Sequence, residues 1–201
     1  MYRRDIEQFL GPVAEKYPVI TLLGPRQSGK STLARSFFPD YTYVSLETPD
    51  DRTLAEGDPR GFFKKFPAPV VIDEIQRVPE LLSYIQTFVD EPGFKQKFVL
   101  TGSQQLLLME KVTQSLAGRT VIAKLLPFSY EELLQKPDHP ALQEIDTLIF
   151  TGSYPRIYDK DLSPRQWLEQ YFQTYVERDA RSLLNIERLD LFDRFIGLFL
   201  R

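Results

Sequence analysis

Short hydrophobic runs alternate with segments of helical periodicity through the first 127 residues of the chain. The runs predict strands at 18–23, 41–47, 70–73, 97–103 and 120–126. The run VVID at 70–73 begins with three consecutive apolar residues, which is typical of a parallel strand buried on both faces. The alternation of strands and helices predicts an α/β fold, with a mostly parallel five-stranded sheet between two layers of helices.

Helical periodicity fills most of the intervals between these strands. It predicts helices at 4–16, 32–38, 79–91 and 104–116. The segment GDPRGFFKKFPAP at 57–69 is expected to form two short helical pieces because prolines interrupt it. The letters TPDD at 48–51 are typical of a turn.

After Pro127 the strand pattern stops and helical periodicity continues. Helices are expected at 129–135, at 141–150 and from about Pro164 onward. We therefore expect two domains, an α/β core over 1–127 and a helical segment over 128–201. The last helix carries a wide apolar stripe that must pack against other residues. Its members are Trp167, Leu168, Tyr171, Phe172, Tyr175 and Val176.

The final segment ERLDLFDRFIGLFLR, at 187–201, is rich in leucine and phenylalanine. It ends without a capping glycine, a proline or a polar tail. An exposed apolar segment of this kind promotes association or aggregation. We therefore expect the sequence to be a fragment, with the missing remainder or a partner covering this helix.

Composition narrows the classes of function. The chain is 42% hydrophobic and 26% charged, close to globular averages, and no apolar run is long enough to span a membrane. The start MYRRDIEQFL lacks the apolar core of a secretory signal, so a cytoplasmic location is expected. Cysteine is absent and His139 is the single histidine, which argues against zinc sites and histidine catalysis. The net charge of −3 gives the whole chain no electrostatic footprint for nucleic acid.

The segment GPRQSGKS, from Gly24 to Ser31, fits the spacing G-x-x-x-x-G-K-S of a phosphate-binding loop. It lies between a predicted strand and a predicted helix, so backbone N–H groups and the positive end of the helix dipole would face a phosphate. Lys30 is expected to reach the β- and γ-phosphates, and Ser31 to offer its hydroxyl to Mg²⁺. The residues expected around the nucleotide are Gly24, Pro25, Arg26, Gln27, Ser28, Gly29, Lys30, Ser31 and Thr32.

Two acids, Asp73 and Glu74, close the apolar run VVIDE. Asp73 at the carboxyl end of its strand is expected near the phosphate loop, where it would hold Mg²⁺ directly or through water. Glu74 would accept a hydrogen bond from an attacking water and orient it. Small-molecule P-loop kinases exclude water and usually lack such an acid, so the pair favours hydrolysis. The plain structural alternative is an acidic strand end that caps the next turn.

The next strand ends in the letters TGS, which place two hydroxyls there, Thr101 and Ser103. Ser103 is the first choice for a group between the γ-phosphate and the catalytic acid, although a turn that satisfies only local backbone groups explains it equally well. Arg119, Arg178 and Arg181 are candidates for a phosphate contact within the subunit or from a neighbour. For each arginine a surface ion pair is the better single explanation.

Five segments together resemble prokaryotic AAA-type ATPases with a C-terminal domain of unknown function: GPRQSGKST, VVIDEIQRVPELL, FVLTGSQQLLL, SLAGR and PFSYEELL. The resemblance implies a P-loop core of the ASCE class, with strand order 5-1-4-3-2, that binds ATP and Mg²⁺. It also implies roles for individual residues: Lys30 and Ser31 for phosphate and metal, Asp73 for metal, Glu74 for hydrolysis, Ser103 as a sensor and Arg119 as an arginine contact. Gln76 belongs to the D-E-I-Q motif and has no assigned task.

The resemblance extends over nearly the whole chain, through the segments YPRIY and YVERDAR. It departs at Thr151-Gly-Ser153, where a glycine pair is expected before Tyr154. In the family the second domain is similar to restriction endonucleases. A nucleic-acid or effector function would therefore lie in residues beyond Arg201.

The leading hypothesis is an ATP-hydrolysing switch in which γ-phosphate contacts change how the helical C-terminal part is held. Self-association would follow if an arginine acted on a neighbouring subunit. One alternative is a nucleotide-gated scaffold with negligible hydrolysis. A phosphotransferase is a weaker alternative, because residues 48–67 supply no clear acceptor pocket or lid, and the lack of an N-K-x-D segment argues against a GTPase.

Overall fold

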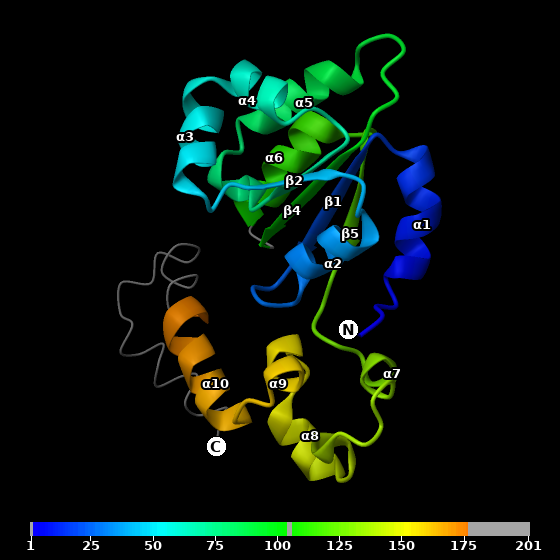
Figure 1. Cartoon of the computed structure of the whole chain (residues 1–201), viewed down its shortest axis with the longest axis vertical. Coiled ribbons are helices and arrows are strands. Elements are labelled where there is room, and N and C mark those ends of the chain that lie inside the picture. Colours follow the sequence, from blue (N-terminus) through cyan, green and yellow to red (C-terminus); the bar gives the residue numbers. More distant parts are fainter. Residues whose placement is uncertain (1, 104–105, 177–201) are drawn as a thin grey trace. The chain divides into compact units, whose positions relative to one another are not determined.

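A computed structural model of the chain describes residues 2–103 and 106–176 (Figure 1). The chain forms two compact units. The first comprises residues 1–139 and 153–155, and the second comprises 140–152 and the residues from 156 onward. The first unit thus continues past Pro127 to His139, and the division expected between 127 and 128 stays a prediction.

Five parallel strands form one sheet in the order β2-β3-β4-β1-β5. They are β1 (Val19–Gly24), β2 (Thr42–Ser45), β3 (Val70–Asp73), β4 (Phe98–Ser103) and β5 (Thr120–Lys124). The predicted α/β fold and the strand order implied by the resemblance are confirmed. Because the strands are parallel, their carboxyl ends meet along one edge of the sheet, where Gly24 lies opposite Ser103.

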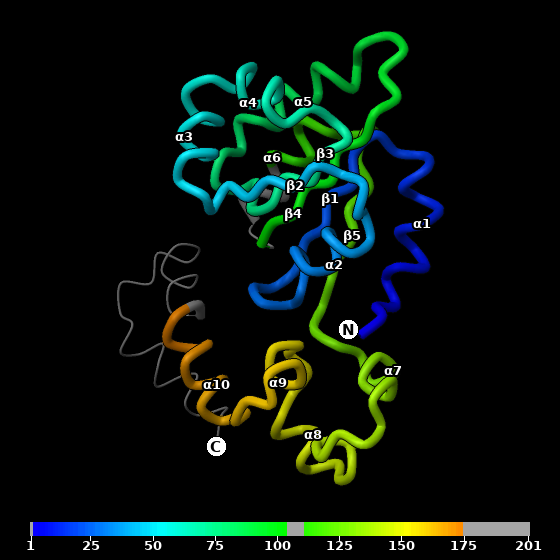
Figure 2. Tube along the Cα trace, viewed as in Figure 1, coloured from blue at the N-terminus to red at the C-terminus, as the bar shows by residue number. Residues whose placement is uncertain are grey.

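Helices cover both faces of this sheet (Figure 2). They are α1 (Glu7–Lys16), α2 (Lys30–Phe37), α3 (Pro49–Gly57), α4 (Pro59–Lys65), α5 (Leu81–Val89) and α6 (Leu106–Leu116). The first two pack on one face, where Leu33 of α2 shares a buried cluster with Val71 of β3. The other four pack on the opposite face, where Leu81 of α5 shares a cluster with Ile72 of β3. Successive residues of β3 therefore serve opposite cores, which is why the run VVID is apolar throughout.

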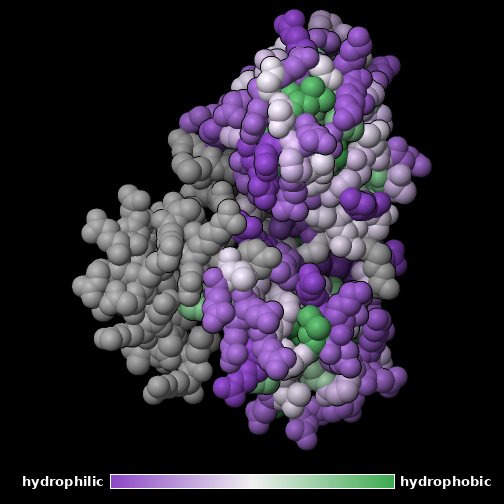
Figure 3. Space-filling model, turned by 60° about the vertical axis from the view of Figure 1, so that its left-hand side comes forward, coloured by the Kyte–Doolittle hydropathy of each residue, from purple (hydrophilic) through white to green (hydrophobic). Residues whose placement is uncertain are grey.

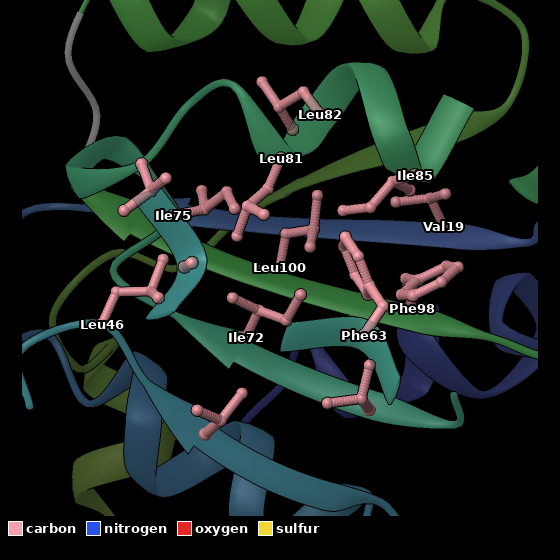
Figure 4. Close-up of a cluster of buried hydrophobic side chains, with 14 of the residues drawn as sticks. Val19, Leu46, Phe63, Ile72, Ile75, Leu81, Leu82, Ile85, Phe98 and Leu100 are labelled. Atoms are coloured by element: carbon pink, nitrogen blue, oxygen red, sulfur yellow. The ribbon is translucent and has the colours of Figure 1, made fainter. Parts of the chain in front are cut away.

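The larger of the two cores lies between β3, β4 and the helix α5 (Figure 4). Leu81, Leu82 and Ile85 of α5 are buried over Ile72 and Leu100 of the sheet. Full burial of one such aliphatic side chain contributes about 1.5–3 kcal/mol relative to exposure. This core fixes the carboxyl end of β3, and with it the position of the acids that follow.

Two local expectations are wrong, and proline explains both. The turn expected at 48–51 is the start of α3, with Pro49 in the first helical turn and two aspartates beside the positive helix end. The segment 57–69 forms the single helix α4 rather than two pieces. Pro59 opens α4 and Asp58 caps it. A proline at the first turn loses no intrahelical hydrogen bond, so these prolines begin helices instead of breaking them.

The helical region expected after residue 127 is present. It contains α7 (Tyr130–Leu133), η2 (Pro140–Leu142), α8 (Ile145–Thr151), α9 (Pro155–Lys160), α10 (Pro164–Tyr171) and the π-helical turn η3 (Phe172–Val176). In α10 the buried Trp167 stacks on Tyr171, with ring centroids 5.0 Å apart, so two members of the predicted stripe pack on each other. The apolar segment 187–201 lies outside the described residues.

The surface coloured in Figure 3 is mostly hydrophilic, with small separate hydrophobic areas. Large exposed hydrophobic side chains occur together on α8, where Ile145, Ile149 and Phe150 are more than half exposed. Among the described helices, none has both the length and the apolar character that crossing a membrane requires.

Candidate nucleotide-binding site

A tight loop joins β1 to α2 and contains both glycines of the phosphate-loop pattern. A Cβ atom at Gly24 would lie 2.0 Å from the carbonyl oxygen of Leu125, so no side chain fits there. Gly29 has a φ of 93° and Gln27 a φ of 60°, both in the left-handed region. The first glycine is thus required by close packing and the second by backbone conformation.

Lys30 spans this loop from the first position of α2. Its ammonium donates hydrogen bonds to the carbonyl oxygens of Gly24, at 3.1 Å, and Pro25, at 2.8 Å, and the residue is only 5% exposed. Burial lowers the pKa of Lys30, while the negative charges of Glu74 and Asp73 oppose that shift. The structure therefore holds a buried positive group over the loop.

The amino end of α2 is open. Gly29 precedes the helix, and no side chain of the described residues caps it, so the first-turn N–H groups have no side-chain acceptor. The other loop residues lie beside this helix end, with Arg26 and Gln27 half-buried and Thr32 exposed. Uncapped N–H groups and the helix dipole together favour an anion.

One buried hydroxyl lies in the loop and another lies beside it. Ser28 is fully buried and Ser103 is 4% exposed, and neither Oγ has a hydrogen-bond partner within the described part of the chain. Ser103 at the end of β4 lies opposite Gly24 in the sheet register, so its side chain is next to the start of the loop. Buried polar groups are almost always hydrogen-bonded, so this pair fits a site that receives a polar ligand.

Asp73 is the centre of a hydroxyl cluster at the end of β3. Ser31 Oγ donates to the carboxylate and lies 3.0 Å from each of its oxygens. Tyr43 donates its hydroxyl to Oδ2 at 2.7 Å, and Thr101 donates to Oδ1. The structure thus brings together Ser31 and Asp73, the two residues predicted to hold a metal ion.

Tyr43 was missed in the sequence, where it is only one position of the strand predicted at 41–47. Burial, followed by its hydrogen bond to Asp73 and the charge of that residue, raises the pKa of Tyr43 to about 12. The Arg35 guanidinium lies 3.6 Å from the centroid of the tyrosine ring and opposes the shift. One signal could have found it: the predicted sheet is mostly parallel, so the strand at 41–47 should end at the same edge as the strand at 70–73.

Glu74 follows directly and occupies an unusual backbone conformation. Its φ of 61° and ψ of 44° lie in the left-handed region, just before the 3₁₀ turn η1 (Ile75–Arg77). The backbone N–H donates to Thr101 Oγ1 at 3.3 Å, and the carboxylate accepts a hydrogen bond from Gln76 Nε2. Burial, and then the nearby negative charge of Asp73, raise the pKa of Glu74. Gln76, which had no task in the sequence reasoning, holds this carboxylate.

Arg119 is not part of this cluster. It precedes β5, and Val19 lies opposite Thr120, so Arg119 is at the amino edge of the sheet, about 20 Å of strand from the loop. Its guanidinium donates to both carboxylate oxygens of the exposed Asp90, at 2.6 and 2.8 Å. The prediction that Arg119 contacts phosphate in its own subunit is therefore inconsistent with this geometry. Arg178 and Arg181 lie outside the described residues.

The side chains around Asp73 could bind a magnesium ion with few protein ligands. The described residues contain no cluster of three or more His, Asp or Glu side chains that could hold a metal. Mg²⁺ usually keeps several waters and binds through one or two carboxylates together with substrate phosphates. The hydroxyl of Ser31 and the carboxylate of Asp73, already in contact, meet that requirement.

Comparison with known proteins agrees with the geometry. Residues 16–134 match the AAA domain family, and residues 142–200 match a domain of unknown function (DUF8612). Uncharacterized proteins of Mycobacterium tuberculosis and Mycobacterium bovis are each 30% identical to the chain over 186 residues, which is 90% of this chain. The chain spans 40% of the length of these two relatives.

A solved structure shares the fold. The Walker-type ATPase PABY2304 of Pyrococcus abyssi superposes with a TM-score of 0.54 and 19% identity, covering 96% of this chain and 76% of that one. The AAA match extends over more than half of the chain and includes the loop, Asp73 and Glu74. The chain therefore belongs to the AAA domain family of P-loop ATPases.

Proposed function

We propose that the protein binds ATP with Mg²⁺, hydrolyses it, and acts as a nucleotide switch coupled to a C-terminal effector domain. One observation carries the proposal: Ser31 of the loop donates a hydrogen bond to Asp73 at the end of β3. This contact joins the two parts that must meet around a metal-bound triphosphate. Membership of the AAA domain family supports nucleotide binding at the same loop.

The loop residues would bind the phosphates. The Lys30 ammonium donates to two neutral carbonyl oxygens, and charged phosphate oxygens are stronger acceptors for it. When bound, Mg²⁺ would neutralise charge on the β- and γ-phosphate oxygens, with Ser31 and Asp73 as its holders. Ser103 would offer its buried hydroxyl next to the γ-phosphate.

Glu74 would orient the attacking water and accept its proton. A raised pKa makes this carboxylate a better proton acceptor than an ordinary glutamate. Its left-handed backbone and the hydrogen bond from Gln76 fix the direction of the side chain. Gln76 would thus set where the water sits.

The coupling part of the proposal rests on length and on the second family match. The chain spans 40% of its mycobacterial relatives, and the match at 142–200 begins where the second unit begins. Any action on nucleic acid would depend on residues outside the described part of the chain. An arginine contact between subunits would come from Arg119, Arg178 or Arg181.

Phosphate release from purified protein with Mg²⁺ and ATP tests this function. The Glu74→Gln variant should bind ATP as the wild type does and lose turnover by about 10²-fold or more, the usual effect of removing a general base. Unaltered turnover in this variant would remove the role assigned to Glu74.

A nucleotide-gated scaffold is the second candidate, because the Gln76 amide already occupies the Glu74 carboxylate. If the protein is such a scaffold, the wild type should bind a fluorescent ATP analogue but release no more phosphate from ATP than the Glu74→Gln variant. Detectable wild-type release that the variant lacks would exclude it.

A further inference from the structure

We propose that Arg4 is a positioning residue of the nucleotide site. It would hold the peptide between Ser28 and Gly29 in its phosphate-binding orientation and tie the loop to the segment 126–132. The inference rests on the proposed nucleotide site and concerns a residue near the amino terminus, outside the phosphate-loop motif.

Arg4 is a buried arginine that reaches the loop backbone. It is 6% exposed, and its Nη1 donates to the carbonyl oxygen of Ser28 at 3.0 Å. Its Nη2 donates to the carbonyl oxygens of Leu126 at 2.8 Å and Pro127 at 3.4 Å. One guanidinium therefore joins the phosphate loop to the chain that leaves β5.

The charge of Arg4 is matched by Glu132, which is equally buried. Arg4 Nε lies 3.0 Å from Glu132 Oε2, with side-chain exposures of 6% and 5%. The other oxygen of Glu132 accepts from the backbone N–H of Asp5 at 2.8 Å. Ser129 and Glu132 also form a capping box at the start of α7. Both carboxylate oxygens of Glu132 are thus hydrogen-bonded, and loss of one partner of this buried pair would leave an uncompensated charge.

The carbonyl contact has a directional consequence for the loop. In a trans peptide the C=O and the next N–H point in opposite directions. Arg4 fixes the Ser28 carbonyl on its own side, so the N–H of Gly29 points away from the guanidinium. The Arg4 Nη1 also lies 3.5 Å from the place where a Gly29 side chain would begin. Arg4 therefore holds the peptide that precedes the left-handed Gly29.

The same contacts reach further along the chain. Phe128 lies 4.7 Å under the Arg4 guanidinium, and its backbone N–H donates to the carbonyl oxygen of Ser153 at 2.9 Å. From these two segments the chain continues into the second unit, at Pro140 and Arg156. Occupancy of the loop would thus be linked to the order of 126–132, and linkage of this kind is reciprocal.

The test uses Arg4→Lys, which keeps the positive charge for Glu132 but loses the fork that reaches Ser28 and Leu126 together. Affinity for a fluorescent ATP analogue should fall by about tenfold, as for one lost charge-assisted hydrogen bond, while turnover at saturating ATP is retained. Arg165→Gln, which breaks an exposed arginine–glutamate contact in α10, is the control and should change neither value.

Hydrogen exchange separates this proposal from the proposed function. Without nucleotide, Arg4→Lys should exchange the amides of 26–30 faster than wild type, whether or not the protein hydrolyses ATP. With the analogue bound, wild type should gain protection at 129–133 and Arg4→Lys should gain less. Loop exchange and affinity equal to wild type would overturn the role of Arg4, whereas a wild type that binds no nucleotide would overturn the proposed function alone. If Arg4→Lys does not fold, Glu132→Gln is compared by the same two measurements, with the same outcomes.

Discussion

The two edges of the sheet carry similar groups in different surroundings. At the carboxyl edge, Asp73 is 4% exposed and accepts hydrogen bonds from three side-chain hydroxyls. At the amino edge, Arg119 and Asp90 form an exposed ion pair with distances of 2.6 and 2.8 Å. The second contact is about as short as the 2.7 Å hydrogen bond from Tyr43 to Asp73 at the first edge. Short distances alone therefore do not identify a functional site; burial and convergence of several groups do.

The pKa values of two carboxylates, Asp90 at the amino edge and Glu74 at the carboxyl edge, are shifted in opposite directions. The hydrogen bond from Arg119 lowers the pKa of Asp90, because it stabilises the ionised form. Burial raises the pKa of Glu74, because it disfavours the ionised form. Only the second shift produces a group that takes up a proton more readily than usual. Variants at both edges test this contrast.

Lys30→Ala should have the largest effect. Truncation of a buried charged partner costs about 2–5 kcal/mol of binding, so affinity for ATP should fall by about a hundredfold or more. Titration with a fluorescent analogue measures the loss, and a melting curve checks that the variant folds. Undiminished affinity would mean that the carboxyl edge is not a phosphate site.

Thr101→Val should have the next largest effect, on stability. The substitution removes a donor to Asp73 and an acceptor for the Glu74 N–H, leaving buried groups unsatisfied. The free energy of unfolding should fall by about 1–3 kcal/mol in urea. Thr87→Val is the matched control, because its hydroxyl bonds only the Ser83 carbonyl at 3.0 Å on an exposed helix surface. If both variants lose the same free energy of unfolding, the hydrogen bonds of Thr101 in the Asp73 cluster contribute no more to stability than an exposed one.

Tyr43→Phe should loosen Asp73 without removing it. We expect the Mg²⁺ concentration for half-maximal turnover to rise by about three- to tenfold, in line with one lost hydrogen bond of about 1 kcal/mol. Because the pKa of Tyr43 is about 12, wild-type activity should show no tyrosine titration near pH 10. Tyr41→Phe, two residues earlier, is the control. An alkaline activity loss near pH 10 that Tyr43→Phe abolishes would contradict this assignment.

Glu74→Gln should stabilise the fold by an amount that depends on pH. A raised carboxyl pKa means that the folded protein binds the proton more tightly than the unfolded chain, so ionised Glu74 destabilises the fold. The neutral glutamine should therefore stabilise the protein above the raised pKa, and the gain should disappear below the ordinary glutamate pKa. Urea unfolding at several pH values measures it. A stabilisation by Glu74→Gln that grows as the pH falls would contradict a raised pKa of Glu74.

Arg119→Ala should have the smallest effect. Exposed ion pairs contribute little to stability, and the residue is far from the loop of its own subunit. Turnover and the urea midpoint should match wild type within error. Turnover lost with ATP affinity retained, and dependent on protein concentration, would instead show Arg119 acting on a neighbouring subunit.

Local sequence patterns predicted the strands of the sheet and the site residues of the phosphate loop and of the run VVIDE. The loop motif and the run VVIDE each encode their own geometry, and parallel strands bring their ends to one edge. The order of the strands came from the resemblance. Neither periodicity nor motif spacing pairs Arg4 with Glu132, because that contact joins residues 128 positions apart. Tyr43 was missed for a related reason, since alternation gives the face of a side chain but not the partner it meets.

Strand β1, which lies between β4 and β5 in the sheet, is synthesised long before either of its partners. Val19 of β1 pairs with Phe98 on one side and Thr120 on the other, whereas Val70 of β3 pairs with the nearer Thr42 and Phe98. At a ribosomal rate of about 5–20 residues per second, β1 stays unpaired for about 4–16 seconds after it is made. An apolar strand left open that long is a place for a chaperone to bind or for nascent chains to associate. Folding yield in a cell should therefore depend more on translation speed and chaperone supply than the finished domain's stability would suggest.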